Sequence, residues 1–235
     1  IILVRPQDYV PVLQEWREQG EVSIETRRYL AAIAFQHTAS YDSTIAAYLR
    51  TSTGDYFPEQ LTLSLERVQP LRYGENPHQQ ASFYRWADAS SSTLPTIAGA
   101  EVLHGKELSF NNLLDLDAAL NSVQSFTAPT IAIIKHTNPC GLACDDTLVE
   151  AYKQARAGDP VSAYGGIIGS NRPLDEATAN EIAQLFYEAI IAPDFSSGAL
   201  AILRQKKNIR LLATHTPIEP KGINTQMLHA GHPNV

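Results

Sequence analysis

Short apolar runs that alternate with helical segments constrain the fold of this chain more than any other feature of its sequence. The runs are rich in isoleucine or leucine and lie at 131–134, 167–168, 190–191 and 209–212. Helical periodicity marks the stretches near 112–123, 146–157, 175–188 and 197–206, and Asp175 is placed to cap the third of these. Strands that alternate with helices in this way predict an α/β layered domain.

The two ends of the chain lack this alternation. Pro6, Gln7 and Asp8 open an expected helix that runs to about Gln19 and ends at Gly20. Ser23 can cap a second, longer helix, whose pattern breaks at residues 51–55. We therefore expect residues 1–66 to form a helical appendage, residues 67–212 to form the α/β domain, and residues 213–235, which contain three prolines and two glycines, to form an irregular tail.

Composition excludes several classes of protein. The net charge of -7 and the lack of a basic run argue against a nucleic-acid-binding protein. No apolar run approaches the roughly 18 residues needed to span a membrane, and the first ten residues do not resemble a signal peptide. Two cysteines do not make a disulfide framework, so we expect a cytoplasmic protein. A first residue other than methionine suggests a processed chain or a fragment.

The pair Cys140 and Cys144 raises the question of a metal site. Zinc deaminases carry P-C-x-x-C together with a separate H-x-E, but here the spacing after Pro139 is C-x₃-C and no H-x-E occurs. A structural zinc site would also need a second pair of ligands. We predict no metal and interpret the cysteines as two small, partly buried thiols.

The dipeptide Lys135-His136 follows the apolar run at 131–134. It places two ionisable groups at the carboxyl end of a predicted strand, where α/β sheets bind their ligands. An imidazole can act as a base near neutral pH, and a lysine as a cationic donor. The alternative is a hydrogen-bonded histidine at a strand end beside a solvated lysine. From these two residues alone the alternative is favoured.

Three further stretches carry candidate binding groups. In 71–79, Arg72 beside Tyr73 can hold an anionic group, and in 159–166 a Gly-Gly pair permits close approach of a ligand. The stretch 106–112 places backbone and amide donors before a helix. Taken singly, each is better explained as a polar loop, a tight turn or a helix cap.

Taken together, five motifs form one pattern: LRYGENPHQ, GKELSFNNLLDLDAAL, IKHTNPCG, DPVSAYGG and YEAIIAP, in this order between Leu71 and Pro193. They resemble the bifunctional purine-biosynthesis enzymes that join an AICAR formyltransferase to an IMP cyclohydrolase, and the resemblance covers roughly residues 1–212. It implies a cytidine-deaminase-like fold without zinc for residues 67–212, the first half of the formyltransferase domain. It also implies that residues 1–66 are the helical end of the cyclohydrolase domain and a linker.

The resemblance implies formyl transfer from 10-formyltetrahydrofolate, as co-substrate, to the 5-amino group of AICAR, which gives FAICAR. That amine is a poor nucleophile because its lone pair is delocalised into the ring, so a base and a cationic donor must act together. By position in the motif, His136 corresponds to the proton acceptor and Lys135 to the polarising or proton-delivering partner. The resemblance thus reverses the preference stated above for these two residues.

The resemblance also implies a set of nucleotide contacts. Arg72 and Tyr73 match residues that grip the phosphate and base, Asn112 a base contact, Gly165 a backbone contact and Glu188 a ribose contact. It implies a homodimer in the intact enzyme, with small-molecule ligands and neither nucleic acid nor membrane as partner. The front of the cyclohydrolase domain and the second half of the transferase are not recognisable, so we expect an incomplete central piece. A non-catalytic nucleotide-binding fragment and a zinc deaminase relative remain as alternatives.

Overall fold

The structure is a computed structural model that describes residues 1–55, 57–87 and 95–218. The chain divides into two compact units. The first comprises Ile1–Val68 and residues 84–87, and the second comprises Gln69–Phe83 and the described residues from 95 onward. Each unit has its own pattern of burial.

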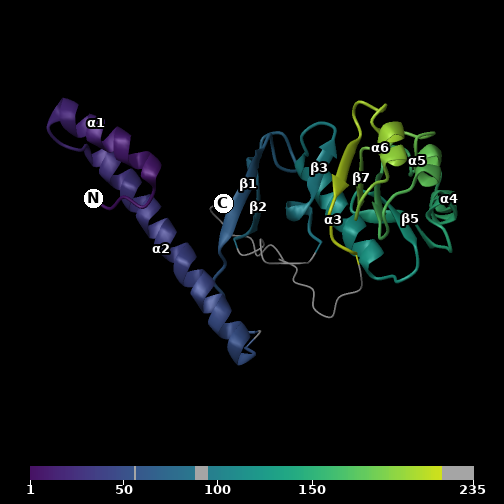
Figure 1. Ribbon diagram of the computed structural model, residues 1–235, viewed down its shortest axis with the longest axis horizontal. Coiled ribbons are helices and arrows are strands. Elements are labelled where there is room, and N and C mark those ends of the chain that lie inside the picture. The colour runs from purple at the N-terminus through teal and green to yellow at the C-terminus, as the bar shows by residue number, and fades with distance from the viewer. Residues whose placement is uncertain (56, 88–94, 219–235) are drawn as a thin grey trace. The chain divides into compact units, whose positions relative to one another are not determined.

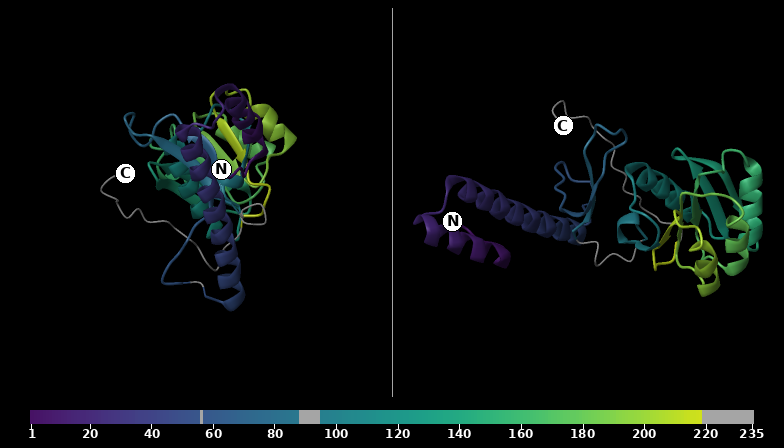
Figure 2. Two further views of the ribbon diagram at one scale, coloured as in Figure 1. Left: turned by 90° about the vertical axis from the view of Figure 1, so that its left-hand side faces the viewer. Right: turned by 90° about the horizontal axis from the view of Figure 1, so that it is seen from above.

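The first unit opens with a short 3-10 helix, η1 (Pro6–Asp8), followed by α1 (Tyr9–Gln19) and the long α2 (Ile24–Thr53). The predicted caps are confirmed: Gly20 adopts a left-handed φ of 78° after α1, and the Ser23 hydroxyl accepts a hydrogen bond from the Thr26 amide. Figure 2 shows α1 alongside the first part of α2. None of the described helices has both the length and the apolar character needed to cross a membrane.

The predicted break at 51–55 was placed too early, because α2 continues to Thr53 and ends at Gly54, whose φ is 73°. The threonine hydroxyls in this last part of the helix bond back to carbonyls one turn earlier, as hydroxyl side chains within helices commonly do. Thr51 donates to the Ala47 carbonyl at 3.0 Å, and Thr53 donates to the Leu49 carbonyl at 3.2 Å. The polar run therefore extends the helix, and the glycine ends it.

Two strands follow that the sequence analysis did not predict. β1 (Leu65–Leu71) and β2 (Ala81–Trp86) form a two-stranded sheet. An ion pair between Arg85 and Glu66, at 3.1 Å, joins them. Most of their residues are exposed or half-buried, which explains why no apolar run marks them in the sequence.

The second unit is built on a six-stranded sheet with the order β3-β8-β7-β6-β4-β5. Its strands are β3 (Glu101–His104), β4 (Thr130–Lys135), β5 (Asn138–Cys144), β6 (Ile167–Ser170), β7 (Ala189–Ala192) and β8 (Arg210–Ala213). β6, β7 and β8 are parallel, while β3, β4 and β5 pair antiparallel with their neighbours. The four strands expected from apolar runs are confirmed, and the edge strands β3 and β5 are additional.

Helices cover both faces of this sheet, as Figure 1 shows. They are α3 (Phe110–Gln124), α4 (Leu148–Gly158), α5 (Glu176–Ile182) and α6 (Ser197–Leu203). Alternate residues of β4 face opposite layers: Ile131 and Ile133 pack with α4, α5 and α6, whereas Ala132 and Ile134 pack with α3. The predicted α/β layered architecture is confirmed.

The helix expected at 175–188 is shorter than predicted. Asp175 caps it as expected, with its carboxylate accepting from the Thr178 amide at 2.7 Å, but α5 ends at Ile182. The chain then returns to the sheet, where the Glu188 amide bonds to the Gly166 carbonyl at 3.0 Å before β7 begins. A longer helix would carry this segment past that contact. At the C-terminal end, Ala213 belongs to β8, and residues 219–235 of the expected tail lie outside the described residues.

Candidate functional site

Several of the sequence motifs meet at one end of the six-stranded sheet. β4 is antiparallel to β6, so its last residue, Lys135, lies where β6, β7 and β8 begin. β3 is antiparallel to β8 and ends on the same side, with His104 opposite Leu211. We call this end of the sheet the site edge: it comprises the ends of β3 and β4 and the starts of β5 to β8. The segments 105–112, 135–138, 159–166 and 186–188 all adjoin it.

Lys135 and Gly165 lie together at the site edge. The Lys135 ammonium donates a hydrogen bond to the Tyr164 carbonyl at 2.8 Å. Gly165 has a φ of 69°, and a Cβ at this position would lie 3.3 Å from the Lys135 Nζ. A side chain here would adopt an unfavourable backbone conformation and crowd the amine. The Gly-Gly stretch therefore does more than form a turn, because it gives the lysine room beside the backbone.

Asp159 holds the loop that supplies the carbonyl for Lys135. Its carboxylate accepts from the amides of Val161 and Ser162, at 3.1 and 2.9 Å, and from the Ser162 hydroxyl at 2.6 Å. These bonds, foremost the one from the Ser162 hydroxyl, stabilise the charged carboxylate and lower the pKa of Asp159 below its ordinary value. The loop is thus ordered by its own side chains.

His136 lies in a two-residue turn between β4 and β5, and not in the strand itself. His136 and Thr137 both have positive φ values, 52° and 63°, as a type I′ turn requires. The His136 carbonyl accepts from the Thr137 hydroxyl at 2.7 Å and from the Asn138 side-chain amide at 2.9 Å. Within the described residues the imidazole makes no hydrogen bond, and the residue is exposed. The reading of His136 as a hydrogen-bonded structural residue is therefore not supported by these contacts.

Glu188 lies next to the loop that contains Gly165. One carboxylate oxygen accepts from Arg210 Nη1 at 2.7 Å, and the side chains are 40% and 14% exposed respectively. Arg210 also approaches the Glu107 carbonyl at 3.4 Å, which connects the start of β8 to the segment before α3. The second oxygen of a carboxylate can accept further bonds. The sequence analysis did not identify Arg210, and no motif signals it.

Asn112 is the third residue of α3 and forms a capping box with Ser109. The backbone amide of Asn112 donates to the Ser109 hydroxyl, and the side-chain oxygen of Asn112 accepts from the backbone amide of Ser109, both at 3.2 Å. The interpretation of this stretch as a helix cap is therefore confirmed. The side-chain NH₂ group is the part of Asn112 that can still donate to a ligand.

Arg72 and Tyr73 directly follow β1 and belong to the second unit. The Arg72 guanidinium stands 5.7 Å from the centroid of the Tyr73 ring, a cation–π geometry. Gln79 closes the loop that follows: its carbonyl accepts from the Gly74 amide and its side chain from the Asn76 amide. Within the described residues no hydrogen bond or ion pair joins Arg72 or Tyr73 to Lys135, His136 or Glu188. Their place in a common site stays a prediction.

The two cysteines are on β5 and do not converge. Four residues along a strand separate their Cα atoms by about 13 Å, far beyond the reach of two thiolates on one zinc ion. Cys140 donates to the Ile133 carbonyl at 3.4 Å, and Cys144 lies 3.0 Å from the Thr130 hydroxyl. Burial raises the pKa of the Cys140 thiol, which favours the protonated form. Over the described ranges, no three His, Cys, Asp or Glu side chains are grouped to hold a metal ion.

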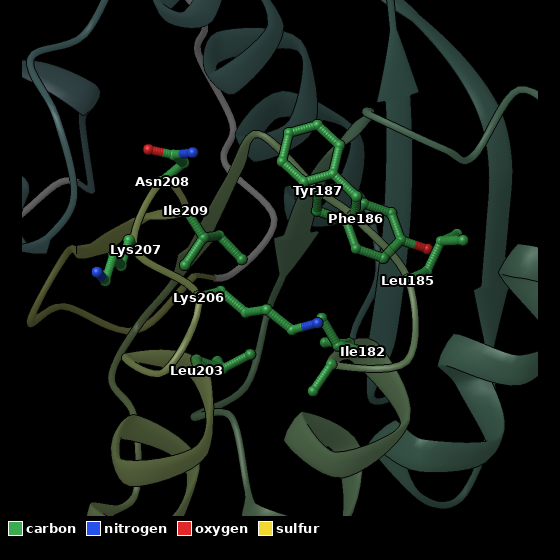
Figure 3. A pocket seen from close by; sticks show the side chains of 10 residues that line it. Ile182, Leu185, Phe186, Tyr187, Leu203, Lys206, Lys207, Asn208 and Ile209 are labelled. Atoms are coloured by element: carbon green, nitrogen blue, oxygen red, sulfur yellow. The ribbon is translucent and has the colours of Figure 1, made fainter.

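A cavity of about 200 Å³ lies among α5, α6 and the segments that lead into β7 and β8. Its lining is Ile182, Ala183, Leu185, Phe186, Tyr187, Leu203, Lys206, Lys207, Asn208 and Ile209. Figure 3 shows the Lys206 side chain extending toward Ile182. Sites for drug-sized ligands usually exceed about 300 Å³. None of the candidate site residues lines this cavity, although Phe186 and Tyr187, which do line it, directly precede Glu188.

Fold and site together define a mixed α/β domain whose polar loops gather at one end of its sheet. Comparison with known proteins gives the family. The chain belongs to the AICARFT/IMPCHase bienzyme family, whose model matches residues 1–232.

Its relatives include the bifunctional purine biosynthesis protein PurH of Bacillus cereus (strain AH820) and that of Bacillus anthracis (strain A0248). Both are 51% identical over 214 residues, which is 91% of this chain and 41% of each relative. The PurH protein of Bacillus cereus (strain 03BB102) is 50% identical over the same share. The chain thus spans less than half the length of these relatives.

Proposed function

We propose that these residues belong to a bifunctional enzyme of de novo purine biosynthesis. It transfers a formyl group from 10-formyltetrahydrofolate to AICAR and closes the product, FAICAR, to IMP. Family membership and the identity to PurH proteins support the pathway. The observation that carries the transferase assignment is the pair at the site edge: Lys135 bonded to a backbone carbonyl, and His136 exposed on an ordered turn.

We assign residues 67–212 to the first cytidine-deaminase-like half of the transferase domain, and residues 1–66 to the helical end of the cyclohydrolase domain and a linker. A sheet covered by helices on both faces supports the first assignment. The dominance of α1 and α2 in the first unit supports the second. The tail expected at 213–235 is assigned from residue 214 onward, because Ala213 is the last residue of β8.

In the proposed reaction, His136 accepts a proton from the 5-amino group of AICAR as its nitrogen attacks the formyl carbon. The new carbon–nitrogen bond forms while the bond from the formyl carbon to the folate nitrogen breaks. Lys135 donates a hydrogen bond to the formyl oxygen as negative charge develops there, or delivers a proton to the leaving nitrogen. One ammonium hydrogen is engaged by the Tyr164 carbonyl, so two remain for the substrate.

The substrate contacts follow from the same assignment. Arg72 holds the phosphate, Tyr73 and Asn112 contact the base, the Gly165 backbone approaches the ligand, and Glu188 accepts from the ribose. The free oxygen of the Glu188 carboxylate and the Asn112 NH₂ group support these roles. We further propose that the enzyme is a cytoplasmic homodimer that uses no metal. Its ligands are AICAR and folate, and neither nucleic acid nor membrane is a partner.

The decisive experiment uses a chain of the relatives' full length that contains these 235 residues, called the full-length enzyme below. His136→Ala should lower kcat for FAICAR formation at least about a hundredfold, the lower end of the range for general-base catalysis. The Kd for AICAR should change by less than about threefold, because the group acts on the reacting amine. His37→Ala, an exposed histidine on α2, is the matched control and should leave both values unchanged. Near-normal kcat with a large loss of affinity would make His136 a binding group and refute the assignment.

A second experiment tests the phosphate contact. Arg72→Ala in the full-length enzyme should weaken AICAR binding by about 1.5–3 kcal/mol, the range for charge-assisted hydrogen bonds. Affinity for the unphosphorylated nucleoside should hardly change. Arg85→Ala, an exposed arginine on β2, is the control. Equal losses for nucleotide and nucleoside would show that Arg72 does not bind the phosphate.

The rival interpretations have their own tests. If the protein only binds nucleotides, the full-length chain should bind AICAR in calorimetry but show no turnover. A zinc deaminase relative would contain about one zinc per chain, lost on Cys140→Ser. For the 235-residue chain alone we expect AICAR binding without turnover, because productive geometry needs the amine and the formyl donor held together.

A further inference from the structure

One carboxylate from another element bonds directly to the turn that contains His136. Asp115, in the second turn of α3, accepts a hydrogen bond from the Thr137 amide at 2.6 Å. The two residues are 22 positions apart in the sequence, so this contact exists only through the fold. Hydrogen bonds to a charged acceptor are shorter and stronger than those between neutral groups.

The turn needs such support because its backbone is unfavourable. His136 and Thr137 are consecutive non-glycine residues with positive φ, and for a β-branched residue such as Thr137 this is rare. The two bonds to the His136 carbonyl come from Thr137 and Asn138, which are part of the turn or adjoin it. Among the described residues, Asp115 is the one side chain from another element that bonds to the turn.

The helix that carries Asp115, α3, packs against β4, the strand that leads into the turn. Leu113 and Leu116 of α3 are buried, and they pack in one cluster with Ala132 and Ile134 of β4. The carboxylate therefore projects from a helix whose position relative to the end of β4 is determined by core packing. Side chains on such elements hold a geometry more tightly than side chains on loops.

We propose that Asp115 is a positioning residue for His136. Its carboxylate holds the Thr137 amide, which sets the turn and with it the direction of the His136 imidazole toward the substrate amine, beside Lys135. This inference rests on the proposed function of His136 as the proton acceptor. A purely structural role would predict something different: loss of the bond would lower the melting temperature and leave kcat of the folded enzyme unchanged.

The test compares two replacements of Asp115 in the full-length enzyme. Asp115→Ala should lower kcat for FAICAR formation about 10–100-fold, since misplacement of a reacting group by ~1 Å costs about a hundredfold. The Kd for AICAR should stay within about threefold, because in this proposal Asp115 acts through the turn and not on the substrate. Asp115→Asn keeps an oxygen that accepts from the Thr137 amide and should recover kcat to within about fivefold of the original.

The chain offers a matched control on the same helix. Asp117 lies two residues further along α3, is exposed, and accepts a hydrogen bond from the Asn121 side chain at 2.9 Å. Asp117→Ala removes a carboxylate of the same kind without touching the turn, and should leave kcat and Kd unchanged. A drop in kcat for Asp117→Ala as large as that for Asp115→Ala would overturn the inference.

Hydrogen exchange separates this inference from the proposed function. In Asp115→Ala the Thr137 amide should exchange at least about tenfold faster than in the original enzyme, under conditions where both are folded. The positioning role is wrong if three results occur together: the Thr137 amide exchanges faster in Asp115→Ala, Asp115→Ala keeps full kcat, and His136→Ala is inactive. The turn would then have lost its bond to Asp115 without any effect on catalysis. If His136→Ala is fully active, the proposed function has failed, and the positioning role fails with it.

Discussion

The two units of this chain bury very different shares of their residues. α2 contains 30 residues, of which one, Leu30, is buried. β4 contains six residues, of which five are buried. In the first unit the large side chains Phe35, Tyr41 and Tyr48 are 77%, 63% and 73% exposed. In the second unit the inner strands β4, β6, β7 and β8 are enclosed between two helical layers.

The difference separates two origins of regular structure. The helices of the first unit are defined by local interactions: the Ser23 cap, the left-handed glycines at 20 and 54, and hydroxyl-to-carbonyl bonds near the end of α2. Such interactions set where a helix begins and ends but contribute little stability, which comes mainly from tertiary packing. The second unit has that packing, and it also holds Lys135, His136, Gly165 and Glu188, whose geometry must be maintained for the proposed chemistry.

The largest expected effect concerns hydrogen exchange in the 235-residue chain. Amides of 131–134 in β4 should exchange at least about a thousandfold more slowly than those of 40–50 in α2, because core strands open only with global unfolding. Exchange measured by mass spectrometry on peptides from the two segments gives the comparison. Equal protection of the two segments would contradict the proposed difference between the units, because it would mean that tertiary contacts hold α2 as firmly as β4.

Two alanine replacements, one in each unit, test the same difference through the free energy of unfolding. Ile133 is fully buried in the second unit, so Ile133→Ala should lower the free energy of unfolding by about 2–5 kcal/mol. Phe35→Ala removes a larger side chain from α2 but should change it by less than about 0.5 kcal/mol, as for other exposed sites. Urea unfolding of the 235-residue chain measures both. A Phe35→Ala effect comparable to that of Ile133→Ala would contradict the picture of an uncovered helix.

Matched helix caps should behave differently in the two units. Asp175 caps α5 and Ser23 caps α2, each through a side-chain oxygen that accepts a backbone amide. Asp175→Ala should lower the free energy of unfolding of the second unit by about 1 kcal/mol, a typical value for a lost cap. Ser23→Ala should reduce the helical signal in circular dichroism and leave the main urea transition in place. A shift of that transition by Ser23→Ala would show that α2 unfolds together with the sheet.

The smallest expected effect is on acid stability. The pKa of Asp159, in the second unit, is lowered chiefly by the Ser162 hydroxyl, and that of Glu15, in the first unit, chiefly by Ser23. A lowered folded-state pKa stabilises the fold above the unfolded-state pKa, and this stabilisation is lost as pH falls through the folded-state value. Ser162→Ala should therefore raise the pKa of Asp159 and move acid unfolding of the second unit to a slightly higher pH.

The parallel change in the first unit serves as the control. Ser23→Ala should raise the pKa of Glu15 without moving the acid transition of the second unit. Carboxyl chemical shifts followed by NMR over the acid range report both pKa values, and fluorescence follows unfolding. An acid transition that moves equally in both variants would show that the two units unfold as one.

Much of the secondary structure could be predicted because it depends on neighbours in the sequence. Apolar runs marked β4, β6, β7 and β8, and caps marked the starts of α2 and α5. The edge strand β5 was not predicted, because its sequence NPCGLAC contains proline and glycine and is mostly half-buried or exposed. Its strand structure follows from pairing with β4, a contact that no local pattern reveals.

By itself, then, the sequence determined the α/β class, the caps and the motifs that mark Lys135, His136, Gly165 and Glu188 as candidates. Only the tertiary structure decided that His136 lies in a positive-φ turn, that Asp115 bonds to that turn, and that Arg210 pairs with Glu188. Caps and hydrophobic periodicity depend on residues a few positions apart and can therefore be predicted from the sequence. The contacts at the site edge join residues 22 positions apart, and they form only once the core has packed and brought the strand ends together.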